Sequence, residues 1–135
     1  MYQRYHLSYT DALKIIAAIQ AELEKQNLGA AIAVADEHGE LIAFLRTDGC
    51  KLPSINIAIN KAFSAAREGV ESRAIGDASR KENFPMTNFG DLRYTAWGGG
   101  VPIKYEGKVI GAVGVSGLPE KEDMNLARMG ANLIR

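Results

Sequence analysis

Residues 98–117 read GGGVPIKYEGKVIGAVGVSG, and this stretch decides the fold. Two apolar strand patterns flank the dipeptide Glu106-Gly107, an arrangement typical of a hairpin with a short turn. Gly111 and Gly114 lie inside the second strand pattern, where glycine gives up side-chain packing and chain stiffness. Repeated glycine there predicts that another backbone, a helix or the plane of a ligand lies directly against this ribbon.

The segments on either side of this hairpin predict helices and a packed loop. Pro119 and the acidic residues that follow it are typical of the start of a terminal helix that runs to Arg135. Residues 86–97 have no clean period, but their aromatic residues indicate a packed loop rather than a free linker. A shorter polar helix is expected from Ser72 to Asn83, and it ends where Phe84 precedes a proline.

The N-terminal half predicts a helix, a hairpin and a second helix. Ser8 and Asp11 have the spacing of a capping box, and Leu13 begins an apolar helical face that continues until Gly29. Residues 30–35 and 41–45 are apolar runs joined by a turn, so we expect a hairpin with two well-buried strands. Pro53 suits the first turn of a helix that ends at Gly69 and lies on the sheet.

This order of elements favours one fold class. Helix, hairpin, two helices, loop, hairpin and helix (α-β-β-α-α-β-β-α) join the strands as antiparallel pairs, which predicts an α+β sheet covered by helices. The 135 residues are expected to form a single domain, residues 1–135, that needs no disulfide or structural metal.

Composition excludes several classes of function. Lysine and arginine number 16, as do aspartate and glutamate, so no excess of positive charge is present to bind a nucleic-acid backbone. No apolar run is long enough to span a bilayer, and the N-terminus has no apolar signal core, so we expect a cytoplasmic protein without a membrane partner. The single cysteine, Cys50, cannot form an internal disulfide.

Several segments together resemble the GlcG/HbpS family, which includes the C-terminal domain of PduO-type proteins. The likeness extends over nearly the whole chain. It is carried by residues 34–41, 46–49, Ser54, Ala58, 61–62, 99–103, 111–117, 122–123, Ala127 and Gly130.

The resemblance implies a profilin-like α+β fold, a dimer or larger homo-oligomer, and a shortlist of roles. Members include secreted haem-binding sensors, and other relatives are encoded beside genes for glycolate oxidation or for glycerol and diol dehydratases. It carries no axial haem ligand onto a matching position of this sequence.

Only two histidines, His6 and His38, offer an imidazole for haem or a metal. His38 stands in a hairpin turn, where a solvated polar side chain is ordinary. His6 precedes the first helix, where it could cap, pack or ligate, and is the better candidate for an axial haem ligand. Neither histidine has a carboxylate arranged as an obvious orienting partner, so the sequence predicts no metal site.

The charged residues Asp36, Arg46, Asp48 and Lys61 fall where they could converge at the edge of the sheet and bind a carboxylate. The alternative is that they form ion pairs that stabilise the fold, such as Arg46 with Asp48 or Lys61 with Asp36. A second set of candidates, whose backbone could form the floor of a flat ligand pocket, comprises Gly99, Gly100 and Gly117. Trp97 and Tyr94 beside them could stack on a tetrapyrrole or cover the core.

Two functions follow from these observations. The first is a small-molecule-binding module without catalysis of its own, for haem or a related tetrapyrrole, which holds the ring on apolar surface and the propionates on arginine or lysine. The second is an accessory protein or enzyme in glycolate, glycerol or diol catabolism. A plain oligomeric scaffold, whose glycine-rich hairpin packs only against protein, is a third possibility.

Overall fold

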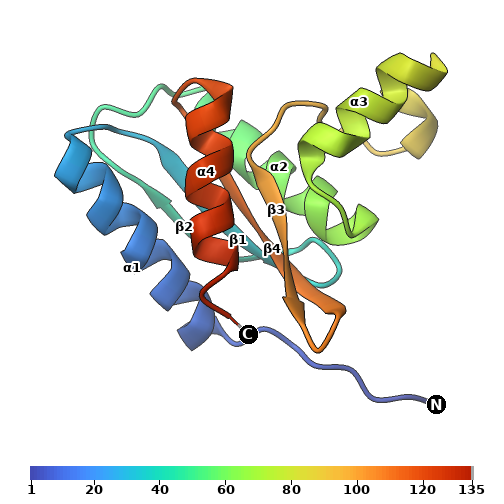
Figure 1. Cartoon of the computed structure of the whole chain (residues 1–135), viewed down its shortest axis with the longest axis horizontal. Coiled ribbons are helices and arrows are strands. Elements are labelled where there is room, and N and C mark those ends of the chain that lie inside the picture. Colours follow the sequence, from blue (N-terminus) through green and yellow to red (C-terminus); the bar gives the residue numbers. More distant parts are fainter. Residues whose placement is uncertain (135) are drawn as a thin grey trace.

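The computed structural model describes residues 1–134 and has the predicted order of elements (Figure 1). Its helices and strands are α1 (Tyr9–Gln26), β1 (Ala31–Asp36), β2 (Leu41–Arg46), α2 (Ser54–Glu68), α3 (Ser72–Glu82), the short 3-10 helix η1 (Met86–Phe89), β3 (Gly100–Tyr105), β4 (Lys108–Ser116) and α4 (Glu120–Ala131). The last helix therefore ends earlier than predicted, and Arg135 lies outside the described residues.

The strands form one antiparallel sheet in the order β2-β1-β4-β3. The two hairpins lie side by side because the first strand of one pairs with the second strand of the other. This arrangement confirms the predicted α+β class with an antiparallel sheet. It also makes β2 an edge strand whose residues are only partly buried, so the expectation of two well-buried strands in the first hairpin holds for β1 alone.

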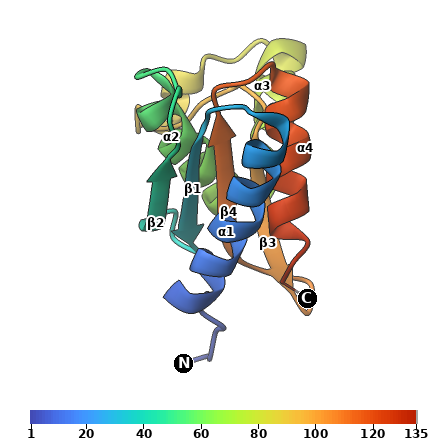
Figure 2. The same ribbon diagram turned by 90° about the vertical axis from the view of Figure 1, so that its left-hand side faces the viewer.

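Helices cover both faces of the sheet, with α2 on one face and α1 and α4 on the other (Figure 2). The two faces carry side chains of different size because residues alternate along a strand. On β1, Ala31, Ala33 and Ala35 pack against α2, whereas Ile32 and Val34 join the large apolar core beneath α1 and α4.

The glycines of the second hairpin allow the backbone of α2 to approach the sheet closely. Gly100 and Gly114 are paired across β3 and β4. A Cβ atom on Gly114 would lie 2.1 Å from the carbonyl oxygen of Ala58, and one on Gly100 would lie 2.2 Å from that of Lys61. The predicted neighbour of the glycine-rich ribbon is therefore the backbone of helix α2.

The first helix shows which local signals were reliable. Ser8 accepts a hydrogen bond from the amide of Asp11, as the capping pattern predicts. The helix ends at Asn27, which adopts the left-handed conformation, and therefore ends before Gly29. Leu13, placed by the sequence on the buried face, is exposed, because the face that meets the sheet contains Ala12, Ile15, Ile16, Ile19 and Leu23.

The loop between α3 and β3 is packed, as predicted, and its rings form a chain of contacts. Tyr94 stacks on Phe89 with ring centroids 4.2 Å apart and meets the edge of buried Phe63 at 5.3 Å. Phe89 also contacts Phe84. Tyr94 thus covers the core at this point, which is one of the two roles expected for it from the sequence.

Replacing Gly114 by alanine tests the close approach of α2. We expect Gly114→Ala to lower the free energy of unfolding by about 1–3 kcal/mol, or to prevent folding, because the new methyl group meets helix backbone that cannot move aside. Guanidinium denaturation followed by circular dichroism measures the change. Lys104→Ala, on the exposed side of β3, is the control. Equal stability of the two variants would contradict the packing described here.

Candidate functional site

The predicted site residues lie at opposite ends of the sheet. Arg46 is opposite Ala31, which in turn faces Ser116, so Arg46 lies at the same end of the strands as Gly117. Asp36 is paired with Gly111 at the other end. The expected convergence of Asp36 with Arg46, Asp48 and Lys61 is therefore wrong, because the full length of strand β1 separates Asp36 from the end of the sheet where Arg46 lies.

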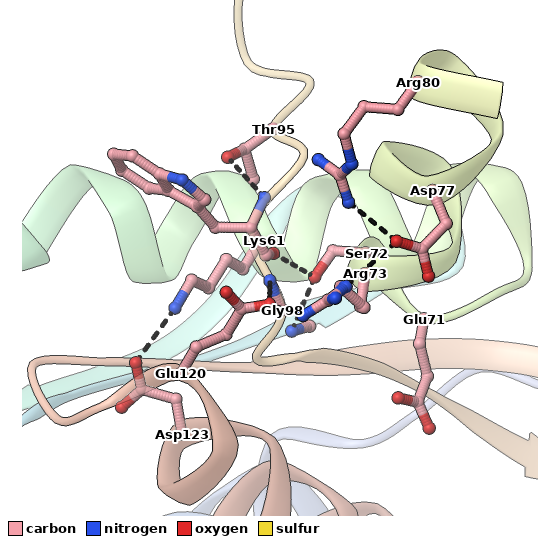
Figure 3. Close-up of polar contacts among 12 residues, drawn as sticks. Lys61, Glu71, Ser72, Arg73, Asp77, Arg80, Thr95, Gly98, Glu120 and Asp123 are labelled. Atoms are coloured by element: carbon pink, nitrogen blue, oxygen red, sulfur yellow. Dashed lines mark hydrogen bonds and ion pairs between the residues drawn. The ribbon is translucent and has the colours of Figure 1, made fainter.

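Lys61 is buried, and its partner is Asp123 rather than Asp36 (Figure 3). The Lys61 and Asp123 side chains are only 3% and 4% exposed. Lys61 Nζ donates hydrogen bonds to the Val115 carbonyl at 2.9 Å and to Asp123 Oδ2 at 3.1 Å. Asp123 Oδ1 accepts the amide proton of Leu118 at 3.0 Å. These bonds tie α2 to the end of β4 and to the first turn of α4.

Burial changes the proton affinity of both members of this pair. Burial lowers the pKa of Lys61, and the nearby carboxylate of Asp123 opposes that effect. Burial likewise raises the pKa of Asp123, against the opposing effect of the Lys61 charge. The sequence signal that could have identified Asp123 is the acidic first turn of α4, which by itself indicates only the start of a helix.

The predicted glycines surround this lysine. A Cβ atom on Gly99 would lie 2.8 Å from Lys61 Nζ, and Gly100 meets the Lys61 backbone. Lys61 therefore occupies the space that a flat ligand would need directly above Gly99 and Gly100. Gly117 differs, because it lines an open pocket beside the lysine.

This Lys61 pocket has a volume of about 330 Å³. Trp97 is 59% exposed and lines it, so this ring does not cover the core. Glu120 stands at the same pocket, where it accepts hydrogen bonds from Arg73 at 2.7 Å and from the Gly98 amide at 3.2 Å (Figure 3). The lining residues are Lys51, Ser54, Ile57, Lys61, Trp97, Ser116, Gly117, Leu118, Glu120 and Asp123.

Arg46 and Asp48 are exposed and do not line this pocket. Cys50 lies near them, and burial raises the pKa of its thiol, against the effect of the Arg46 charge. A raised pKa keeps the thiol protonated, which is the opposite of what a cysteine nucleophile requires. Cys50 is therefore no activated nucleophile, and it does not line the Lys61 pocket.

A larger groove lies at the other end of the molecule, beside His6. This His6 groove has a volume of about 710 Å³ and is walled mainly by aliphatic and aromatic side chains. Tyr5 and Tyr105 meet edge to face there, with ring centroids 4.9 Å apart. The lining residues are Tyr5, His6, Asp11, Lys14, Ala18, Tyr105, Ile110, Leu133 and Ile134.

The His6 imidazole is held by a carboxylate, Glu37, that lies far from it in the sequence. His6 Nδ1 lies 2.5 Å from Oε1 of Glu37, a residue of the β1–β2 turn whose side chain is only 1% exposed. This contact engages Nδ1 and leaves Nε2 available to a ligand. Carboxylates commonly orient a ligating histidine in this way.

Comparison with known proteins gives the family of this chain. Residues 7–132 match the family described as "Haem degrading protein HbpS-like". Protein GlcG of Escherichia coli strain K12 is 39% identical over 116 residues, which cover 82% of this chain and 81% of that protein.

Solved structures confirm the fold. A variant of HbpS from Streptomyces reticuli superposes with a TM-score of 0.89 at 26% identity, over 100% of this chain and 91% of that chain. A complex named PduOC:Heme superposes with a TM-score of 0.88 at 21% identity, over 97% and 96% of the two chains, and shows the fold alone. Among the helices of residues 1–134, none combines the length and the apolar character needed to cross a membrane.

The buried pair predicts an asymmetric response to mutation. Asp123→Leu leaves the Lys61 ammonium buried without its countercharge, so we expect a loss of about 3–5 kcal/mol in the free energy of unfolding. The double variant Lys61→Met with Asp123→Leu removes both charges and is expected to recover a large part of that loss.

Urea denaturation of the wild type, the single variant and the double variant measures this recovery. Glu122→Gln, at an exposed neighbour on α4, is the control and is expected to stay within about 0.5 kcal/mol of the wild type. A single variant as stable as this control would show that the pair contributes nothing.

Proposed function

The chain belongs to the HbpS-like family, and from that premise we propose that it is a binding module for haem or a related tetrapyrrole, without catalysis of its own. The family description names haem, and the PduOC:Heme complex is an example of the same fold holding haem in another protein. Within this chain, the His6 groove is the site that suits such a ligand.

The single observation that carries the proposal is the groove itself. Its volume of about 710 Å³ is more than twice the 330 Å³ of the Lys61 pocket and lies within the usual range for sites that enclose a large organic ligand. Ile110, Leu133 and Ile134 offer apolar surface for a macrocycle, and Lys14 stands at the same groove as a cation for a propionate.

His6 is the residue that would hold the iron. Histidine is a common axial ligand of haem, and a carboxylate on its other nitrogen raises its basicity and fixes the orientation of its ring. Glu37 provides that carboxylate, and the His6 side chain is 69% exposed, so its free nitrogen is accessible. A bound haem would supply a redox-active iron; the described residues orient the imidazole and exclude water from the ring.

The other predicted ligand residues serve this proposal less directly. Lys61 and Gly117 line the smaller pocket, which suits a small anionic ligand better than a macrocycle. Asp36, Arg46, Asp48, Gly99 and Gly100 stay predictions as ligand contacts. A homo-oligomer, a cytoplasmic location and the alternative role in glycolate, glycerol or diol catabolism also stay predictions.

Titration of the purified protein with haemin tests the proposal. We expect a saturable shift of the Soret band, weakened at least about tenfold in His6→Ala, because the axial ligand is lost. Tyr9→Ala, which removes an exposed ring near the same helix end but does not line the groove, is the matched control.

A titration without saturation, or equal affinities of His6→Ala and Tyr9→Ala, would contradict haem binding through His6.

A separate measurement tests the claim that the protein does not degrade haem. After addition of ascorbate in air, we expect the Soret band to persist, and its rapid loss in the wild type would indicate degradation.

A further inference from the structure

The turn between β1 and β2 contains a buried carboxylate, Glu37, whose polar contacts are with two exposed histidines. The Glu37 side chain is 1% exposed, and both of its carboxylate oxygens are buried without a hydrogen-bond partner. Within residues 1–134, these two oxygens are the buried side-chain oxygen or nitrogen atoms that have no hydrogen-bond partner. Such a group is costly to bury unless something with compensating charge sits beside it.

Two imidazoles approach this carboxylate from different segments of the chain. His6 comes from the N-terminal segment, with Nδ1 2.5 Å from Glu37 Oε1, and His38 comes from the turn itself, with Nδ1 3.6 Å from the same oxygen. Both imidazoles are largely exposed, at 69% and 64%, so they can adjust their positions. Both imidazoles therefore approach the same oxygen of the Glu37 carboxylate.

Asp36 completes the surroundings and fixes the turn. Its Oδ1 accepts the amide protons of His38 at 2.8 Å and of Glu40 at 3.0 Å, and it lies 3.9 Å from the His38 imidazole. One potential ligand atom from each of Asp36, Glu37 and His38 lies within 4.8 Å of the others. The turn is thus held in the conformation that presents Glu37 and His38 together.

We propose that Asp36, Glu37 and His38 form a binding site for a divalent transition-metal ion of the zinc type, with His6 as a neighbouring imidazole that contacts Glu37. An imidazole nitrogen together with two carboxylates is a donor set that such ions accept, whereas calcium and magnesium select oxygen ligands alone. Three protein ligands leave a coordination position for water or another molecule. The sequence pattern did not predict this site because the burial of Glu37 and its contact with His6 arise only from the fold.

An ion pair between Glu37 and the histidines is the competing explanation. The geometry favours a metal because three side chains of the same turn place their ligand atoms within 4.8 Å of one another. A dication would compensate the Glu37 carboxylate and bind His38 at the same time. One consequence rests on the proposed function: because His6 contacts Glu37, a metal on Glu37 would change the affinity of the protein for haem.

Cobalt(II) is the probe, because its visible absorption reports coordination by nitrogen and oxygen ligands. Haem-free protein, dialysed against a chelator, is titrated with Co²⁺, and Zn²⁺ affinity is measured by calorimetry. We expect saturation at one equivalent. Glu37→Gln and His38→Gln are each expected to weaken binding at least about tenfold. Glu82→Gln, at an exposed position of α3, is the matched control and should bind like the wild type.

Failure of this proposal is distinguishable from failure of haem binding. His38 does not line the His6 groove, so His38→Gln should lose metal affinity and keep the haemin titration of the wild type. Because His38 is exposed, His38→Gln is expected to fold, so the metal site can still be tested if Glu37→Gln does not fold. Absence of saturable Co²⁺ binding, or Co²⁺ affinity in His38→Gln and Glu37→Gln equal to that of Glu82→Gln, would overturn the metal site.

Discussion

The close approach of helix α2 to one face of the sheet is the constraint on which the rest of the structure depends. That face is formed by alanine and glycine, and the backbone of α2 rests where side chains would otherwise stand. Since strand residues alternate between faces, the same strands place Ile32, Val34, Val113 and Val115 on the opposite face. The large apolar core is therefore concentrated under α1 and α4, whereas α2 packs on its face of the sheet through small residues such as Ala58 and Ala62.

This packing accounts for the buried lysine. The absence of side chains at Gly99 and Gly100 leaves room for Lys61 between the helix and the sheet, and its ammonium group reaches the end of β4. Its ammonium group must then find partners within the protein, and the Val115 carbonyl and Asp123 provide them. The first turn of α4 is thereby fixed against the end of the glycine-rich hairpin.

The sequence predicted features that depend on neighbouring residues and missed contacts between residues that are far apart in the chain. The cap at Ser8, the Glu106-Gly107 turn and the helix against the glycines follow from local chemistry and short periods, and all three are present. The pairs Lys61 with Asp123 and His6 with Glu37 join segments far apart in the chain, and no local pattern specifies them. Leu13 shows the intermediate case, where a helical period was right but the choice of face depended on tertiary packing.

The two ends of the sheet differ in whether their buried charged groups form hydrogen bonds. At one end, Lys61 and Asp123 are buried but their polar atoms are engaged, so the pair is explained as part of the fold and the adjoining pocket is small. At the other end, Glu37 is equally buried but accepts no hydrogen bond, and two exposed imidazoles stand beside it. A carboxylate in that state is costly to bury unless a positive charge compensates it. A ligand that engages Glu37, directly or through a histidine, would provide this compensation, which is why both proposals concern the β1–β2 turn and the adjoining groove.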